Sequence, residues 1–259
     1  MKKNQFNKYT LVSKIKKEVK KMPGYYVHLA ACDKKARDDR SFVLGVEIPD
    51  LLKTYYKLYG INGTREKYNK LKTPIMPDFS RLSERVQQEE TDNGCNGMHF
   101  GWSSNPDYMC FLSTLKEEEK QNPFFRGYLW HLLTDLLIYS FLNIEKRFND
   151  FAKNHQNDDN LQELLNNEYK KLHNDWDKIN TIIRYTYPDV MLTPEVIELN
   201  IIQYIQNENT TYVDLNIIIY LLNYLRMFNP INQPIDYLIE QIKELLTKKN
   251  YVKTKNILT

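Results

Sequence analysis

The chain has 259 residues, of which 42% are hydrophobic and 13% aromatic, and this composition excludes a disordered chain. With 8 glycines and 10 prolines it is neither collagen-like nor dominated by linkers. The 36 basic and 33 acidic residues leave a net charge of +3, which is too small to indicate a specific nucleic-acid partner.

The three cysteines, Cys32, Cys95 and Cys110, form no CxxC pair. Such a set favours reduced thiols in a cytoplasmic protein over a disulfide framework or a cysteine zinc site. The N-terminus lacks the continuous apolar segment of a signal peptide, and no apolar run is long enough for a membrane span. We therefore expect a cytoplasmic protein that is neither exported nor embedded in a membrane.

Residues 1–21 form a basic segment with eight lysines. Leu11, Ile15 and Val19 recur at i, i+4 and i+8, which predicts a short amphipathic helix. Two interpretations remain open: the segment docks weakly on its own domain, or it contacts an anionic membrane surface.

The next part of the chain alternates between helical patterns and interruptions. Residues 25–36 and 50–59 fit helices, and the apolar stretch 42–48 between them is expected to stop at Pro49. Residues 60–97 carry Asn-Gly signals and prolines, which predict a long surface loop with one turn of helix near 80–90.

After Met98 the pattern becomes strongly helical, and period-2 alternation is nearly absent. The sequence predicts an all-α, single-domain multi-helix bundle. In it, residues 1–21 are the basic segment, 22–185 a metal-binding helical core, and 186–259 C-terminal helices packed on the same domain. The expected helices of this part are 106–119, 124–148, 161–185, 194–206, 213–228 and 234–248.

The segment GYLWHLLTDLLIYSFL contains the pair most suggestive of chemistry. His131 and Asp135 are four residues apart, so their side chains share one face of a helix. Leucines and aromatic residues surround them on every other side, which indicates a buried helix. A buried carboxylate is costly unless it is paired or binds a metal. An internal hydrogen bond and a metal ligand are both compatible with this pair.

Three more residues of the same two types lie beside apolar residues at the edges of elements. They are His28 in YYVHLAAC, Asp50 in FVLGVEIPD and His99 in GMHFGW. Histidine and aspartate together are the ligand set expected for zinc or another divalent ion with nitrogen and oxygen donors. The chain has no P-loop, GxGxxG, HExxH or GxSxG motif that would indicate a different chemistry.

The series MPGYYVHLAA, GVEIPD, MHFGW and NPFFRGYLWHLLTD resembles the bacterial zinc-dependent phospholipase C group and its smaller hydrolase relatives. The fungal single-strand nucleases are more distant members of the same all-helical fold. The resemblance covers about residues 22–185 and implies a metal cluster. Its ligands would be His28, Asp50, His99, His131 and Asp135.

The chain also departs from that group. The secreted lipases use their N-terminal amine as a ligand, whereas 27 residues precede His28 here, and the later histidines of the group are missing. The stretch YKKLHNDWDKIN is a candidate replacement, from which we expect Asp175 and then His173 as ligands. We therefore predict one or two metal ions, zinc first, with manganese or iron also compatible.

These residues predict a metal-dependent hydrolase of phosphoester bonds, acting on a small phosphoester through a metal-activated water. Asp50 is the expected catalytic residue, because it could accept a proton from that water. One alternative is a catalytically inactive protein of the same fold with a structural metal. Another is a peripheral membrane or partner-binding protein that acts through the lysine-rich N-terminus.

Overall fold

A computed structural model describes residues 24–71, 73–88, 97–193 and 210–254, with side chains described through Lys249. Within these ranges the protein is built from helices, and its one sheet has two short strands. The all-α prediction is therefore confirmed. Among the same residues, no helix combines the length and the hydropathy needed to cross a membrane. The expected helices 9–21 and 194–206 lie outside the described residues.

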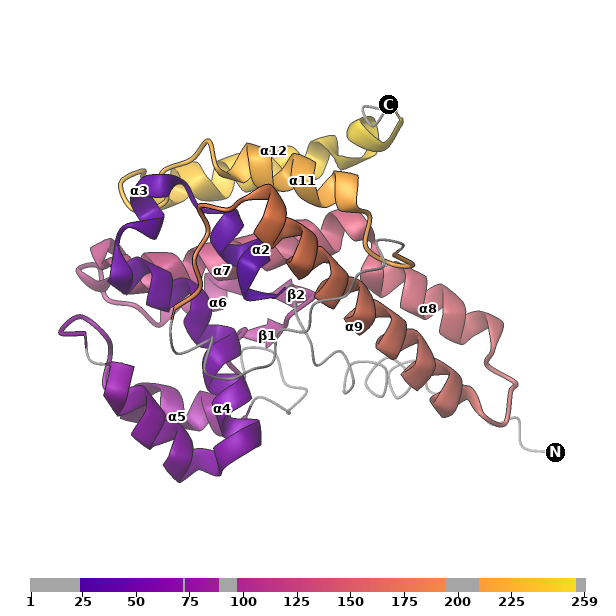
Figure 1. The fold of residues 1–259 in the computed structure, drawn as a ribbon, viewed down its shortest axis with the longest axis horizontal. Coiled ribbons are helices and arrows are strands. Elements are labelled where there is room, and N and C mark those ends of the chain that lie inside the picture. Colours follow the sequence, from indigo (N-terminus) through magenta and orange to yellow (C-terminus); the bar gives the residue numbers. More distant parts are fainter. Residues whose placement is uncertain (1–23, 72, 89–96, 194–209, 255–259) are drawn as a thin grey trace.

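Two helices, α4 (Arg40–Leu71) and α7 (Pro123–Leu142), cross in backbone contact at the centre of the fold (Figure 1). A Cβ atom on Gly45 would lie 1.9 Å from the carbonyl oxygen of Phe124, and one on Gly127 would lie 2.1 Å from that of Phe42. Only glycine fits at either position. The α7 helix starts with Asn122 as its cap and Pro123 in its first turn, and its side chains are buried on nearly all sides.

The α4 helix corrects two expectations about the N-terminal half. It runs through Pro49 without ending, although a proline lacks the N–H that would bond the carbonyl of Gly45. The chain is also helical over most of the expected 60–97 loop. Gly60, with φ 63°, kinks α4 but the helix continues to Leu71, because Thr64, Tyr68 and Leu71 recur on one buried face.

The turn of helix expected near 80–90 is present as α5 (Phe79–Gln87), which packs against α4. The expected helix 25–36 is divided into α2 (Tyr25–Ala30) and α3 (Lys34–Arg37). Asp33 causes the break, because its side chain caps α3 by accepting from the N–H of Ala36.

The segment 97–121 is less regular than the expected helix 106–119. It consists of a turn at 97–100, a hairpin of β1 (Gly101–Trp102) and β2 (Asn105–Pro106), α6 (Tyr108–Ser113) and the 3₁₀ turn η1 (Glu119–Gln121). Phe100 has a φ of 52°, which is rare for a bulky residue, and it lies between Gly97 and Gly101, which also have positive φ.

The remaining helices pack around α7. Asn143, in the left-handed conformation, ends α7 and starts α8 (Ile144–Asn154), so the expected helix 124–148 is two helices. The α8 helix pairs with α9 (Leu161–Thr186), and the two project together in Figure 1. The last helices, α11 (Leu215–Leu225) and α12 (Ile235–Thr254), both contact α7.

The cysteines agree only in part with the expectation of reduced thiols. Cys32 is a buried free thiol, but Cys110 is disulfide-bonded, which removes the thiol argument for a reducing compartment.

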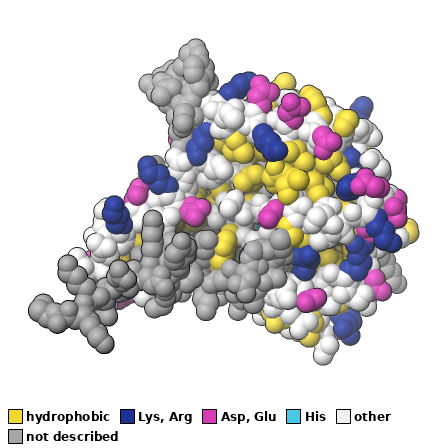
Figure 2. All heavy atoms as spheres, turned by 180° about the vertical axis from the view of Figure 1, so that it is seen from behind, with side chains coloured by type: hydrophobic (Ala, Val, Ile, Leu, Met, Phe, Trp, Pro, Cys, Tyr) yellow, Lys and Arg dark blue, Asp and Glu magenta, His cyan; other side chains and the backbone are white. Residues whose placement is uncertain are grey.

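Figure 2 shows the face opposite that of Figure 1. Apolar side chains gather in its upper part with charged side chains around them, and no histidine of the described residues is visible there.

Candidate metal centre

Five of the predicted site residues converge in the interior, from four separate segments of the chain. The donors are His28 on α2, Asp50 on α4, His99 on the 97–100 turn, and His131 and Asp135 on α7. The three histidines are each 1% exposed, Asp135 is 0% and Asp50 is 7% exposed. Asp50 is therefore the member of this His/Asp cluster that lies nearest the solvent.

The α4–α7 crossing fixes the orientation of His131. Its Nδ1 lies 2.7 Å from the carbonyl oxygen of Val46, the residue after Gly45. A carbonyl only accepts, so Nδ1 carries the proton and donates it, and the Nε2 lone pair is left facing the cluster. Metal-binding histidines characteristically have their second ring nitrogen hydrogen-bonded in this way.

Asp135 is the most deeply buried member of the cluster. One of its carboxylate oxygens is 3.4 Å from His28 Nε2, and the other is 3.5 Å from His131 Nε2 and 3.9 Å from His99 Nε2. Neither oxygen accepts a hydrogen bond within the described residues. A fully buried carboxylate is strongly disfavoured in that condition, because burial removes its hydration.

His99 and Asp50 close the other side of the cluster. His99 Nε2 is 3.1 Å from His131 Nε2 and 3.7 Å from an oxygen of Asp50. Two sets of three donors can be drawn within the described residues, His28–His131–Asp135 and Asp50–His99–His131. His131 belongs to both, and the rings of His28 and His131 stack with centroids 3.9 Å apart.

The spacing of these donors fits a divalent cation. Two ligands at about 2.0–2.1 Å from a tetrahedral zinc ion lie about 3.4 Å apart. The closest donor pairs, at 3.1, 3.4 and 3.5 Å, bracket that separation. Nitrogen and carboxylate donors also match zinc, manganese and iron by type. The two buried carboxylates would balance the charge of one such ion.

The charges around the cluster act on its carboxyl groups. Burial raises the pKa of Asp135 well above its ordinary value, against the lowering effects of His99 and Lys53. Burial also raises the pKa of Asp50, opposed chiefly by His131 and His99. Burial therefore disfavours the ionised form of both carboxyl groups, and a bound cation would stabilise it.

Lys53 is a site residue that the sequence analysis missed. It is only 8% exposed and stands three residues after Asp50, on the same face of α4. Its positive charge lowers the pKa of both Asp50 and Asp135. The spacing alone would have identified it, because Asp50 and Lys53 both lie in the helix expected over residues 50–59.

Two buried tyrosines respond to the charges of the carboxylates. Besides burial, the charge of Asp50 raises the pKa of Tyr25, and the charges of Asp135 and Asp50 raise that of Tyr139. Both phenols are thus neutral hydrogen-bonding groups at physiological pH.

Glu47, also buried and on α4, accepts a hydrogen bond of 2.6 Å from the hydroxyl of Thr193.

The structure does not bring Asp175 and His173 to the cluster. One oxygen of Asp175 accepts from the backbone N–H groups of Thr211, Tyr212 and Val213, so this buried carboxylate fastens the turn before α11 to α9. His173 is half-buried, and it joins neither set of three donors found among the described residues.

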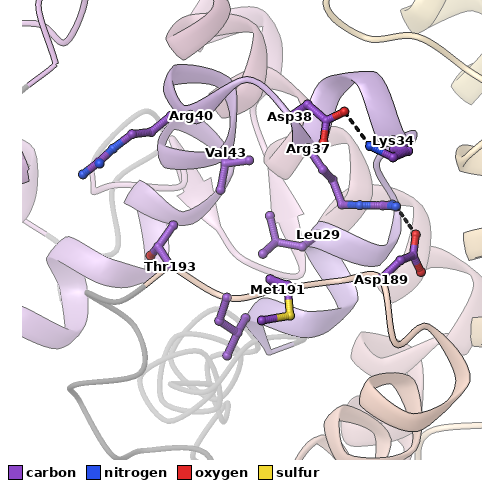
Figure 3. A pocket seen from close by; sticks show the side chains of 10 residues that line it. Leu29, Lys34, Arg37, Asp38, Arg40, Val43, Asp189, Met191 and Thr193 are labelled. Atoms are coloured by element: carbon purple, nitrogen blue, oxygen red, sulfur yellow. Dashed lines mark hydrogen bonds and ion pairs between the residues drawn. The ribbon is translucent and has the colours of Figure 1, made fainter.

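A cavity of about 340 Å³ lies between the N-terminal helices and residues 189–193 (Figure 3). The charged groups at its rim pair with one another, Lys34 with Asp38 and Arg37 with Asp189. Figure 3 shows Arg40 turned away from the other labelled residues. No residue of the His/Asp cluster lines this cavity.

Comparison with known proteins adds no assignment: no family model, no curated protein and no solved structure matches this chain. Any function must therefore be inferred from the geometry and the chemistry of the cluster itself.

Proposed function

We propose that this protein is a metal-dependent hydrolase of phosphoester bonds, with its ion held by His28, Asp50, His99, His131 and Asp135. The observation that supports this most directly is the fixed tautomer of His131, whose Nε2 lone pair faces other donors 3.1–3.5 Å away. The resemblance to the zinc-dependent phospholipase C group supports the same interpretation, and a fold shared with that group is part of the proposal.

A divalent ion, when bound, supplies a water of lowered pKa and a Lewis acid for a phosphoryl oxygen. The protein's own residues would do the rest. Asp50, at the most exposed edge of the cluster, would accept the proton of the attacking water. The Val46 carbonyl would hold the His131 ring in place, so that no reorientation is needed during the reaction.

Lys53 supports an anionic substrate. The positive charge of Lys53 acts on both carboxyl groups, Asp50 and Asp135. A phosphate group is the matching ligand, because its oxygens accept from an ammonium and its charge is neutralised there. We propose that Lys53 binds a phosphoryl oxygen of a small phosphoester.

The near-complete burial of the histidines favours one competing function, that of a structural metal site. A closed site without an open coordination position would hold a structural metal and perform no chemistry. The two proposals predict the same metal content and differ only in turnover, so both must be measured.

The experiment is elemental analysis of the purified protein, followed by turnover of a chromogenic phosphodiester and phosphomonoester with added zinc or manganese. We expect bound metal and turnover that a chelator abolishes. In Asp50→Asn and Lys53→Gln, turnover should be lost or reduced while the melting temperature changes little, and the metal content of Lys53→Gln should stay at the wild-type value. A protein that binds metal but shows no turnover with either ester would be assigned the structural role.

Arg65→Met is a suitable control for these variants, because Arg65 lies over the ring of Phe79 on the surface and its charge affects neither Asp50 nor Asp135. A protein that contains no metal and shows no activity with zinc or manganese would contradict both the hydrolase and the structural-metal proposals.

A further inference from the structure

Of the five donors in the cluster, His99 alone lies on a turn instead of a helix. The other four lie on α2, α4 and α7, where the helical backbone fixes the direction in which each side chain leaves. The Nε2 of His99 nevertheless lies 3.1 Å from that of His131 and 3.7 Å from an oxygen of Asp50. The direction of its side chain therefore depends on the contacts that hold the 97–100 turn.

The backbone of this turn has a conformation that few side chains adopt. Phe100 has a φ of 52°, and Gly97 and Gly101 on either side of it have φ values of 75° and 128°. A bulky residue persists in such a conformation only when the surrounding structure over-determines it. Contacts from outside the turn must therefore hold Phe100, and with it His99, in place.

One such contact comes from α7, the helix that also carries His131. The hydroxyl of Tyr128 donates a hydrogen bond to the carbonyl of Met98, the residue before His99. Tyr128 lies about one helical turn before His131. A single helix thus presents one donor of the cluster and holds the turn that presents another.

The ring of Tyr128 is itself held by aromatic neighbours. It is buried, it stacks on Phe111 with centroids 4.7 Å apart, and it meets Phe100 edge to face at 6.0 Å. Phe111 also meets Phe100 edge to face, at 5.2 Å. A side chain locked by packing in this way holds its hydrogen-bond partner within a narrow range of positions.

We propose that Tyr128 is a positioning residue for the metal centre: its hydroxyl, bonded to the Met98 carbonyl, holds the 97–100 turn so that His99 Nε2 is directed at the ion. Mutating groups that orient a metal ligand typically costs about 10–100-fold in metal affinity. Tyr128 acts on its ligand through the backbone, so we expect an effect of about tenfold. The inference rests on the metal binding of the proposed function, but it requires no turnover and applies equally to a catalytic and a structural ion.

The test is the zinc affinity of the full-length protein, measured by competition with a chromophoric chelator. Tyr128→Phe keeps the ring and loses the hydroxyl, so it should bind zinc about tenfold more weakly. Tyr68→Phe is the matched control, because it removes the same kind of bond, from a buried tyrosine hydroxyl to the carbonyl of Pro77, outside the cluster. Melting temperatures should fall to a similar extent in the two variants, but Tyr68→Phe should keep the wild-type zinc affinity.

A double-mutant cycle with His99→Ala tests whether Tyr128 acts through His99. In that case Tyr128→Phe should cause no further loss of zinc affinity once the imidazole is absent. A general loosening of the fold would instead lower the affinity by the same factor in both backgrounds. The visible spectrum of the cobalt-loaded protein reports the coordination geometry, and it should change in Tyr128→Phe but not in Tyr68→Phe.

A second variant tests the turn without altering Tyr128. Gly101→Ala places a side chain at a φ of 128°, which residues other than glycine rarely adopt, so it should distort the turn and weaken zinc binding. Gly60→Ala, at a φ of 63° in α4 with open space around the added methyl group, is its control and should keep the wild-type affinity.

Wild-type zinc affinity in Tyr128→Phe, or an equal loss in the His99→Ala background, would overturn the role of Tyr128 and leave the metal centre intact. Should Tyr128→Phe fail to fold, Gly101→Ala decides the question, since wild-type affinity there would show that the turn does not direct His99. A wild-type protein that binds no zinc would contradict the metal centre itself, and the role of Tyr128 with it.

Discussion

His131 on α7 donates a hydrogen bond of 2.7 Å to the carbonyl oxygen of Val46 on α4. The bond is possible because Gly45 and Gly127 allow the two helices to approach until their backbones touch. The close contact between α4 and α7 therefore sets the direction of one ring nitrogen in the cluster. Packing and chemistry are coupled at this crossing.

The first prediction concerns this crossing. Gly45→Ala and Gly127→Ala should each lower the free energy of unfolding by about 1–3 kcal/mol, because the new methyl group collides with a backbone carbonyl that cannot move alone. The same displacement should weaken zinc binding. Urea unfolding and zinc titration measure the two effects. Gly63→Ala, where the added methyl meets only the Tyr59 side chain, is the control and should leave zinc affinity unchanged.

A second prediction separates two effects of Asp135: the free energy lost by burying its carboxyl group, and its contribution to zinc binding. In Asp135→Asn, the free energy of unfolding measured with a chelator should not fall, because the variant no longer buries an ionisable carboxyl without hydrogen bonds. With zinc at about one hundred times its dissociation constant, the wild type should gain about 2.7 kcal/mol. The variant should gain much less.

Thermal melting with and without zinc tests this pair of statements. A variant that is as strongly stabilised by zinc as the wild type would show that Asp135 is not a ligand. A variant strongly destabilised in chelator would show instead that the carboxylate is needed for the metal-free fold.

The sequence could indicate the members of the cluster because each one interrupts an apolar stretch. His28, Asp50, His99, His131 and Asp135 all stand where burial would be costly without a partner, and the structure brings them together. That they bind a metal ion stays a prediction. The all-α fold class could also be predicted from the sequence, since helical periodicity dominates the second half of the chain.

Elements that depend on long-range packing were not predictable in this way. Pro49 looked like the end of the apolar stretch 42–48, but α4 runs through it because its buried face packs along α7. The interpretation of Pro49 as a stop also gave no reason to expect the Val46 carbonyl as a partner of His131. The Asn-Gly signals similarly suggested a loop, although tertiary contacts of Tyr68 and Leu71 keep that segment helical.

The third prediction concerns Asp175, which the sequence suggested as a ligand. Asp175→Ala should lower the free energy of unfolding by several kcal/mol, because it leaves the buried N–H groups of Thr211, Tyr212 and Val213 without their acceptor. Metal content per folded molecule should stay at the wild-type value. Elemental analysis of the folded fraction, beside a urea unfolding curve, checks both outcomes. Loss of metal with stability retained would return Asp175 to the ligand set.

The last prediction is a pH dependence centred on Glu168 of α9. Although its partial burial acts in the opposite direction, hydrogen bonds from Lys171, at 2.6 Å, and from the Tyr212 hydroxyl lower the pKa of Glu168 below its ordinary value. A carboxyl with a lowered pKa in the folded state contributes stability above its unfolded pKa of about 4.3. That contribution is lost as the pH falls through the folded pKa.

Glu168→Gln should therefore be less stable than the wild type at neutral pH, by about 1–2 kcal/mol, since two charge-assisted hydrogen bonds are weakened. The difference should shrink as the pH is lowered from about 5 to about 3, because the wild type alone loses the contribution of the ionised group. Urea unfolding at several pH values measures this convergence. Glu163→Gln, an exposed position on the same helix, should run parallel to the wild type throughout. If the Glu168→Gln and wild-type curves also stayed parallel, Glu168 would not be an acid-sensitive contact between α9 and the 210–213 turn.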